Sequence, residues 1–181
     1  MTTEIRRKDR VMKTSREMEI LLEEAEIGRL AVATKDGPYV VPVNYLFFGG
    51  NIYFHSALSG RKVESIRTDA RVCFLVDQVG PQVIYEQKCG VSQIYKSVIC
   101  FGKAEFVEDM IERRAMLERI VQKYLPASLS MDEQNIRMTA VVKIVIERMS
   151  GKVHDFSPSH TVVFNRFHPT QSTEGQQPPV K

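Results

Sequence analysis

Two kinds of hydrophobic pattern follow one another along the first hundred residues of the chain. Between residues 18 and 25 the apolar side chains recur at helical spacing, with glutamates on the opposite side. Thr14 and Glu17 precede this run at the three-residue spacing of a capping box, which is typical of a helix N-terminus. The pattern therefore predicts a helix from about Thr14 that ends at Gly28.

The residues after this helix follow the two-residue period of β-strands. Short runs rich in β-branched and aromatic residues are separated by Asp36-Gly37 and Gly49-Gly50, which are typical hairpin turns. Pro42 lies within one of these runs and cannot donate to a β-ladder, so it marks an edge, a bulge or a gap in the sheet. Strands are predicted for residues 30–34, 39–48 and 52–56.

The rest of the chain continues with strands and few helices. Helices are predicted for residues 61–68 and 108–124, the second with an apolar stripe made by Met110, Leu117, Val121 and Tyr124. Strands are predicted for residues 71–77, 94–107 and 139–149, with a loop-rich span over 78–93 that holds a short strand near 83–85. Short strands joined by hairpin turns favour an antiparallel barrel over a sheet of βαβ units.

These elements predict a single, mainly β domain over residues 14–167. The basic segment 1–13 is expected to be a flexible arm, and residues 168–181, rich in Gln, Pro, Thr and Gly, a disordered tail.

Composition and charge exclude several classes of protein. The 181 residues are 43% hydrophobic and 26% charged, which is ordinary for a globular domain. A net charge of +3, with the aromatic residues inside strand runs, argues against a nucleic-acid partner. No apolar run is long enough to span a bilayer and the polar N-terminus is no signal peptide, so we predict a cytoplasmic protein without a membrane partner. The three cysteines form no CxxC pair, so neither a disulfide framework nor a zinc site is indicated.

The stretch from Ile52 to Lys62 carries the strongest chemical signal. A strand brings His55 and Ser56 to its end, and after a polar turn Arg61 and Lys62 open a helix. Unpaired backbone N–H groups and the dipole make such a terminus favourable for phosphate. The alternative is a surface turn whose two cations are solvated.

The histidines near the C-terminus are weaker candidates. His154, Asp155 and His160 lack a standard metal-ligand spacing, so we expect exposed loop residues and predict no metal site.

Several segments together resemble a known family. The runs GRLAVATKDGPYVVPVNYLF, IYFHSALSGRK, RVCFLVD and YKSVICFGKAEFVED, in this order, are similar to the flavin mononucleotide (FMN)-binding split barrels related to pyridoxamine 5'-phosphate oxidase. Within these, the chain most resembles the Nim-type nitroimidazole reductases. The resemblance extends from about residue 17 to 153. It implies a six-stranded antiparallel, Greek-key split barrel that forms a homodimer, with FMN at each end of the subunit interface.

The resemblance also implies which residues hold the cofactor. One strand would line the flavin ring, and the next would lie beside the ring and ribityl chain. Arg61 and Lys62 would bind the phosphate, and Ser97 takes the place of a glutamine that reaches the flavin in the oxidase. The implied contacts are Pro42, Val43, Asn44, Phe54, His55, Ser56, Arg61, Lys62 and Ser97.

The differences between this sequence and the oxidase narrow the range of expected activities. The chain has no tryptophan and lacks the C-terminal substrate pattern of the oxidase, so oxidation of pyridoxamine phosphate is not predicted. The resemblance implies an oxidoreductase that passes electrons from transiently bound NADH or NADPH to a small acceptor, with His55 as the catalytic proton donor or as a pocket wall. The alternative is a split barrel that binds flavin or haem without turnover.

Overall fold

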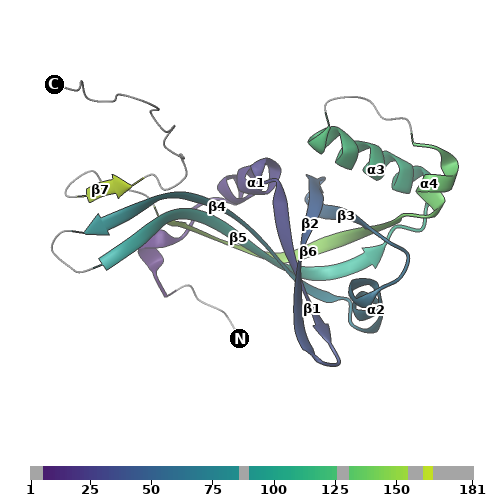
Figure 1. Cartoon of the computed structure of the whole chain (residues 1–181), viewed down its shortest axis with the longest axis horizontal. Coiled ribbons are helices and arrows are strands. Elements are labelled where there is room, and N and C mark those ends of the chain that lie inside the picture. Colours follow the sequence, from purple (N-terminus) through teal and green to yellow (C-terminus); the bar gives the residue numbers. More distant parts are fainter. Residues whose placement is uncertain (1–5, 86–89, 126–130, 155–160, 165–181) are drawn as a thin grey trace, which may run out of the picture.

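The computed structural model describes residues 6–85, 90–125, 131–154 and 161–164. Figure 1 shows the helices gathered around a strongly curved sheet, from which two long strands extend as a twisted pair. The helices are η1 (Lys8–Arg10, a 3-10 turn), α1 (Ser15–Glu24), α2 (Arg61–Thr68), α3 (Met110–Tyr124) and α4 (Glu133–Arg137). The strands are β1 (Ile27–Thr34), β2 (Gly37–Phe48), β3 (Asn51–Ser56), β4 (Arg71–Tyr85), β5 (Gly90–Phe106), β6 (Ala140–His154) and β7 (Thr161–Phe164).

All strand pairings are antiparallel, and six strands close into a barrel. The order is β1-β2-β3-β6-β5-β4, and β4 returns to pair with β1. The short β7 adds to the far end of β4. This confirms the predicted mainly β, six-stranded split barrel.

Two apolar clusters hold the helices on the barrel. The barrel interior is filled by alternate strand residues such as Tyr45, Phe54 and Phe74, and α1 contributes Leu21 and Leu22 to it. A second cluster lies outside the barrel, where α3 and α4 cover part of β3 and β6. It comprises Tyr53, Val107, Met116, Leu117, Ile120, Ile136 and Val141. Met110 is predicted to lie on the apolar stripe of α3. In the structure it is exposed, at the N-terminus of α3.

The first helix ends earlier than predicted. It stops at Glu24, and Gly28 lies inside β1. A Cβ atom at this glycine would overlap the ring of Phe74, so the residue is needed for close packing and not as a helix cap.

The span of residues 78–93 also differs from the prediction. β4 continues through residue 85 and β5 begins at Gly90, so most of the predicted loop belongs to a long hairpin. A register shift between Val79 and Gln82 accommodates Gly80 and Pro81 within β4. At the other end of the chain, β6 runs five residues beyond its predicted end, to His154.

Part of the predicted N-terminal arm contacts the barrel. Val11 forms a bridge with Lys152, the Met12 N–H donates to the Gly151 carbonyl at 3.0 Å, and the Met12 side chain is buried. Residues 1–5 and the predicted tail, 168–181, lie outside the described residues. None of the described helices is long and apolar enough to cross a membrane.

Candidate functional site

The barrel is split where β2 changes its neighbour. Residues 37–44 of β2 pair with β1, the last pair being Asn44 with Ile27, whereas residues 45–48 pair with β3. His55 and Ser56 extend β3 beyond this pairing, and among the described strands they pair with β6 alone. Between residues 40–44 and the end of β3, the facing strand edges therefore have no β-ladder.

The hydroxyl of Tyr124 fixes this change of partner. It accepts from the Tyr45 N–H at 2.8 Å and lies 2.6 Å from the Glu26 carbonyl and 2.9 Å from the Tyr45 carbonyl. A side chain from α3 thus replaces the ladder at the point where β1 leaves β2. The open edge that remains belongs to the β3 side of β2.

The predicted cofactor-lining residues of β2 and β3 meet at this open edge. Pro42 and Asn44 are exposed on the outer face of β2, and Val43 points into the core. Pro42 pairs with Arg29 of β1, and on its other side no described strand pairs with it, although β3 continues along β2 from Tyr45 onward. Of the edge, bulge or gap predicted for Pro42, the structure therefore shows a gap in the sheet. At the end of β3, Phe54 is buried and His55 is exposed.

The two predicted phosphate-binding cations flank the same opening. Gly60, at φ 118°, precedes α2 in a conformation that favours glycine, and α2 begins at Arg61. The Lys62 ammonium lies 5.2 Å from the centroid of the Phe54 ring, and the Arg61 guanidinium lies 5.4 Å from that of Tyr39. The pair therefore bridges the ends of β2 and β3.

The electrostatics of this opening favour an anion. Lys62 is half-buried, and this burial lowers its pKa. Neither Lys62 nor Arg61 forms an ion pair with a carboxylate in the described part of the chain. Although His55 reaches solvent, partial burial lowers its pKa, and the charge of Lys62 lowers it further. A bound phosphate would offset the cost of holding the half-buried Lys62 without a counter-charge.

One predicted residue lies elsewhere. Ser97 pairs with Asp77 and with Lys152, which is eleven residues along β6 from Val141, the partner of His55. At the rise of a β-strand this separation is roughly 35 Å. Ser97 therefore does not contribute to the same site of its own chain.

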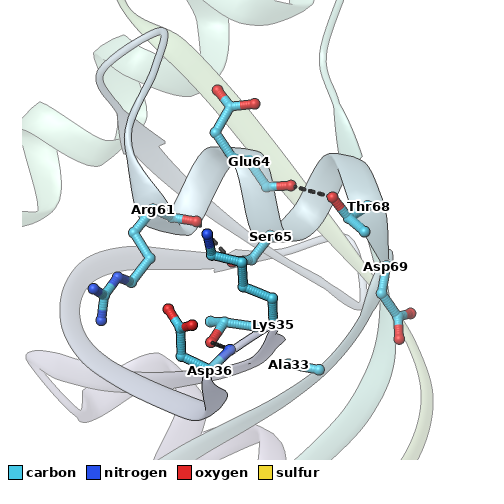
Figure 2. A pocket seen from close by; sticks show the side chains of 9 residues that line it. Ala33, Lys35, Asp36, Arg61, Glu64, Ser65, Thr68 and Asp69 are labelled. Atoms are coloured by element: carbon cyan, nitrogen blue, oxygen red, sulfur yellow. Dashed lines mark hydrogen bonds between the residues drawn. The ribbon is translucent and has the colours of Figure 1, made fainter.

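A cavity next to Arg61 was not predicted from the sequence. It has a volume of about 670 Å³ and lies between the β1–β2 turn and α2 (Figure 2). The only sequence signal was the polar turn around Lys35 and Asp36, and the packing of α2 on β1 brings that turn to the helix. The lining residues are Ala33, Thr34, Lys35, Asp36, Arg61, Glu64, Ser65, Thr68 and Asp69.

The C-terminal histidine prediction is wrong for His154. This residue ends β6 with its side chain buried, and its Nδ1 lies 2.7 Å from the Gln93 carbonyl and 3.3 Å from the Ser92 hydroxyl. Asp155 and His160 lie outside the described residues. Over the described ranges, no group of three or more His, Cys, Asp or Glu side chains could hold a metal ion.

Comparisons with known proteins place the chain in a family. A family profile described as pyridoxamine 5'-phosphate oxidase matches residues 14–153. A structure from Bacteroides thetaiotaomicron, named for 5-nitroimidazole antibiotic resistance, is 30% identical with a TM-score of 0.71, covering 79% of this chain and 86% of that one. A FAD-binding protein from Mesorhizobium loti is 26% identical with a TM-score of 0.61, covering 81% and 98%.

More distant structures share the fold. The flavocytochrome Anf3 from Azotobacter vinelandii is 18% identical with a TM-score of 0.79, covering 97% of this chain and 92% of that one. No curated protein matches the sequence. Because the profile spans most of the barrel and the split-barrel topology agrees with it, the chain belongs to the pyridoxamine 5'-phosphate oxidase family.

Proposed function

We propose that the protein binds FMN at the split between β2 and β3 and passes electrons from a reduced nicotinamide to a small oxidised acceptor. The observation that carries this proposal is the pair Arg61 and Lys62. These cations lack a carboxylate partner among the described residues and lie at a helix N-terminus beside an open strand edge. The similarity to proteins named for flavin binding and nitroimidazole resistance supports the same chemistry.

The residues around the split fit the parts of a flavin nucleotide. Arg61 offers a planar fork and Lys62 a point charge to a phosphate dianion. The unpaired edge of β2 near Pro42 and Asn44 offers backbone groups to the polar edge of a ring system. When bound, the flavin would supply two-electron chemistry between the nicotinamide and the acceptor.

The position of His55 supports a role for it in the acceptor step. It is exposed on the outer face of β3, one residue beyond Phe54, whose ring faces Lys62. Reduction of a nitro group consumes protons, and an imidazolium at this position can donate one to a developing oxyanion. The neutral ring can then recover a proton from water.

A homodimer would complete the site. Ser97, Ile99 and Phe101 lie on the outer face of β5, where all three are half-buried, while Val98 and Cys100 point into the barrel. A second copy covering this face would bury it and could carry its own Ser97 toward the flavin. We therefore propose that each flavin is held by residues of two subunits.

The activity is tested by mixing the flavin-loaded protein with NADH or NADPH and a nitroimidazole under anaerobic conditions. We expect nicotinamide oxidation that depends on the acceptor and on bound flavin. Tight flavin binding without any acceptor-dependent oxidation would instead support the cofactor-binding alternative.

A further inference from the structure

The cavity between the β1–β2 turn and α2 contains charged side chains that have no charged partner in the described part of the chain. Lys35 and Asp36 extend from the turn toward the helix, and Arg61 lies at the opposite wall (Figure 2). None of the three forms an ion pair or a side-chain hydrogen bond through its charged group with any residue that the structure describes. Two cations and one carboxylate are therefore available to a ligand.

The other polar residues of the cavity are already satisfied. Glu64 pairs with Arg67 at 3.2 Å, and Asp69 pairs with Arg71 at 2.7 Å. The hydroxyls of Thr34, Ser65 and Thr68 bond to the carbonyls of Gly37, Arg61 and Glu64, respectively. The free charges thus amount to one net positive charge, so the cavity favours an anion over a cation.

We propose that this cavity binds the ribonucleoside phosphate half of a dinucleotide. Lys35 and Arg61 would bind a phosphate, and the Asp36 carboxylate would accept from the hydroxyls of a ribose, as acidic residues do in other dinucleotide sites. The volume of about 670 Å³ lies within the range of small-molecule pockets, roughly 300–1,000 Å³. This inference rests on the proposed flavin site, because Arg61 lines both the opening and the cavity.

Because Arg61 lines both the opening at the split and the cavity, its position indicates the path that such a ligand would follow along the protein. The first phosphate would lie between Lys62 and Arg61, and a second phosphate would continue from Arg61 toward Lys35. Two molecules carry the required chemistry: FAD as a resident cofactor, or NADH visiting a site already loaded with FMN. A 2'-phosphate beside Asp36 would be repelled, so the visiting donor would be NADH and not NADPH.

The test compares Lys35→Glu with Lys13→Glu, which makes the same charge change at an exposed lysine before α1. One arm measures the affinities of flavin-free protein for FMN and FAD by quenching of flavin fluorescence. The other measures the Michaelis constants for NADH and NADPH with FMN-loaded protein. We expect Lys35→Glu to weaken the affinity for FAD, or to raise the Michaelis constant for NADH, by about tenfold or more. The affinity for FMN should stay within about twofold of wild type.

A second variant tests the volume of the cavity without changing its charge. Thr68 is exposed at the cavity wall, and Thr68→Trp should fill the space and produce the same selective loss. The proposal is overturned if FMN binds normally while both variants leave FAD affinity and the NADH constant at their wild-type values. Failure of the wild-type protein to bind FMN would instead overturn the proposed flavin site itself.

Discussion

The ammonium nitrogen of Lys62 lies 5.2 Å from the centroid of the ring of Phe54, the last residue of β3 that pairs with β2 before the split. The ring favours a cation at this position, but half-burial lowers the pKa of Lys62. The described residues supply no carboxylate to offset the charge. The site around Lys62 is therefore suited to an anion supplied by a ligand.

Replacement of Lys62 by Ala should therefore weaken the binding of FMN much more than that of riboflavin, because only FMN carries the phosphate. We expect a loss for FMN on the order of 10- to 100-fold and a change for riboflavin within about twofold, measured by fluorescence titration. Lys13→Ala, which removes an exposed lysine far along the chain from this site, is the control. Equal losses for both flavins would show that Lys62 does not bind the phosphate.

Replacement of His55 should affect the acceptor step and leave the cofactor bound. His55→Ala is expected to retain FMN and to lose acceptor reduction by a factor on the order of 10²–10⁴ if the imidazole donates the proton. His55→Gln separates this role from hydrogen-bonded positioning, since an amide can bond but cannot supply the proton. If His55→Ala reduces a nitroaromatic acceptor at the wild-type rate, His55 is not the proton donor and serves only as a wall of the pocket.

The pH dependence of the same reaction gives an independent check on His55. Burial and the charge of Lys62 lower its pKa, so the folded protein releases this proton at lower pH than the unfolded chain does. Acceptor reduction should rise as the pH falls from 8 toward 6, because the imidazolium fraction grows. His55→Gln should lose this limb of the profile. The free energy of unfolding depends on pH for the same reason. The stabilising contribution of neutral His55 is fully present above the pKa of the unfolded chain, and it is lost as the pH falls through the pKa of the folded protein.

Replacement of Tyr124 by Phe should destabilise the barrel without altering its surface charge. The variant removes the hydroxyl that bridges Glu26 and Tyr45, and it leaves the Tyr45 N–H without its acceptor. We expect a loss of about 1–3 kcal/mol in the free energy of unfolding, measured by denaturant titration. In Tyr95→Phe the lost hydroxyl makes no hydrogen bond to the described residues, so its effect should stay below about 0.5 kcal/mol. Equal effects of the two changes would argue against the bridging role.

The predicted homodimer can be tested through the outer face of β5. Light scattering of the flavin-saturated protein at micromolar concentration should give the mass of two chains. Ile99→Lys should reduce both the dimer population and the flavin affinity, because it places a charge in the covered face. Ile111→Lys, at an exposed position of α3 and away from β5, is the control. A flavin-saturated monomer would contradict a site shared by two subunits.

The sequence predicted the features that depend on neighbours along the chain. The hairpin turns at Asp36-Gly37 and Gly49-Gly50, and the helix opened by Arg61, follow from local residue preferences, and each appears in the structure. The predicted loop over residues 78–93 was wrong for a physical reason. A bulge accommodates Gly80 and Pro81 within β4, and β5 pairs with β4 on both sides of it.

Features that depend on distant packing were missed. The burial of His154 requires the β5 segment around Gln93, and the role of Gly28 requires the ring of Phe74. The cavity beside Arg61 exists because α2 folds back over the turn at Lys35, some 26 positions earlier in the sequence. No local pattern encodes such contacts, although the resemblance indicated the residues at the split.

Flavin binding itself is tested most directly by the absorption spectrum of the purified protein and by titration of the flavin-free protein with FMN. We predict flavin bands in the visible region, saturation at one FMN per chain, bleaching by reduced nicotinamide in the absence of oxygen, and recovery of the bands when a nitroaromatic acceptor is added. A haem band without flavin, or a flavin-free protein whose titration with FMN shows no saturable binding, would contradict the assignment of the β2–β3 split as a flavin site.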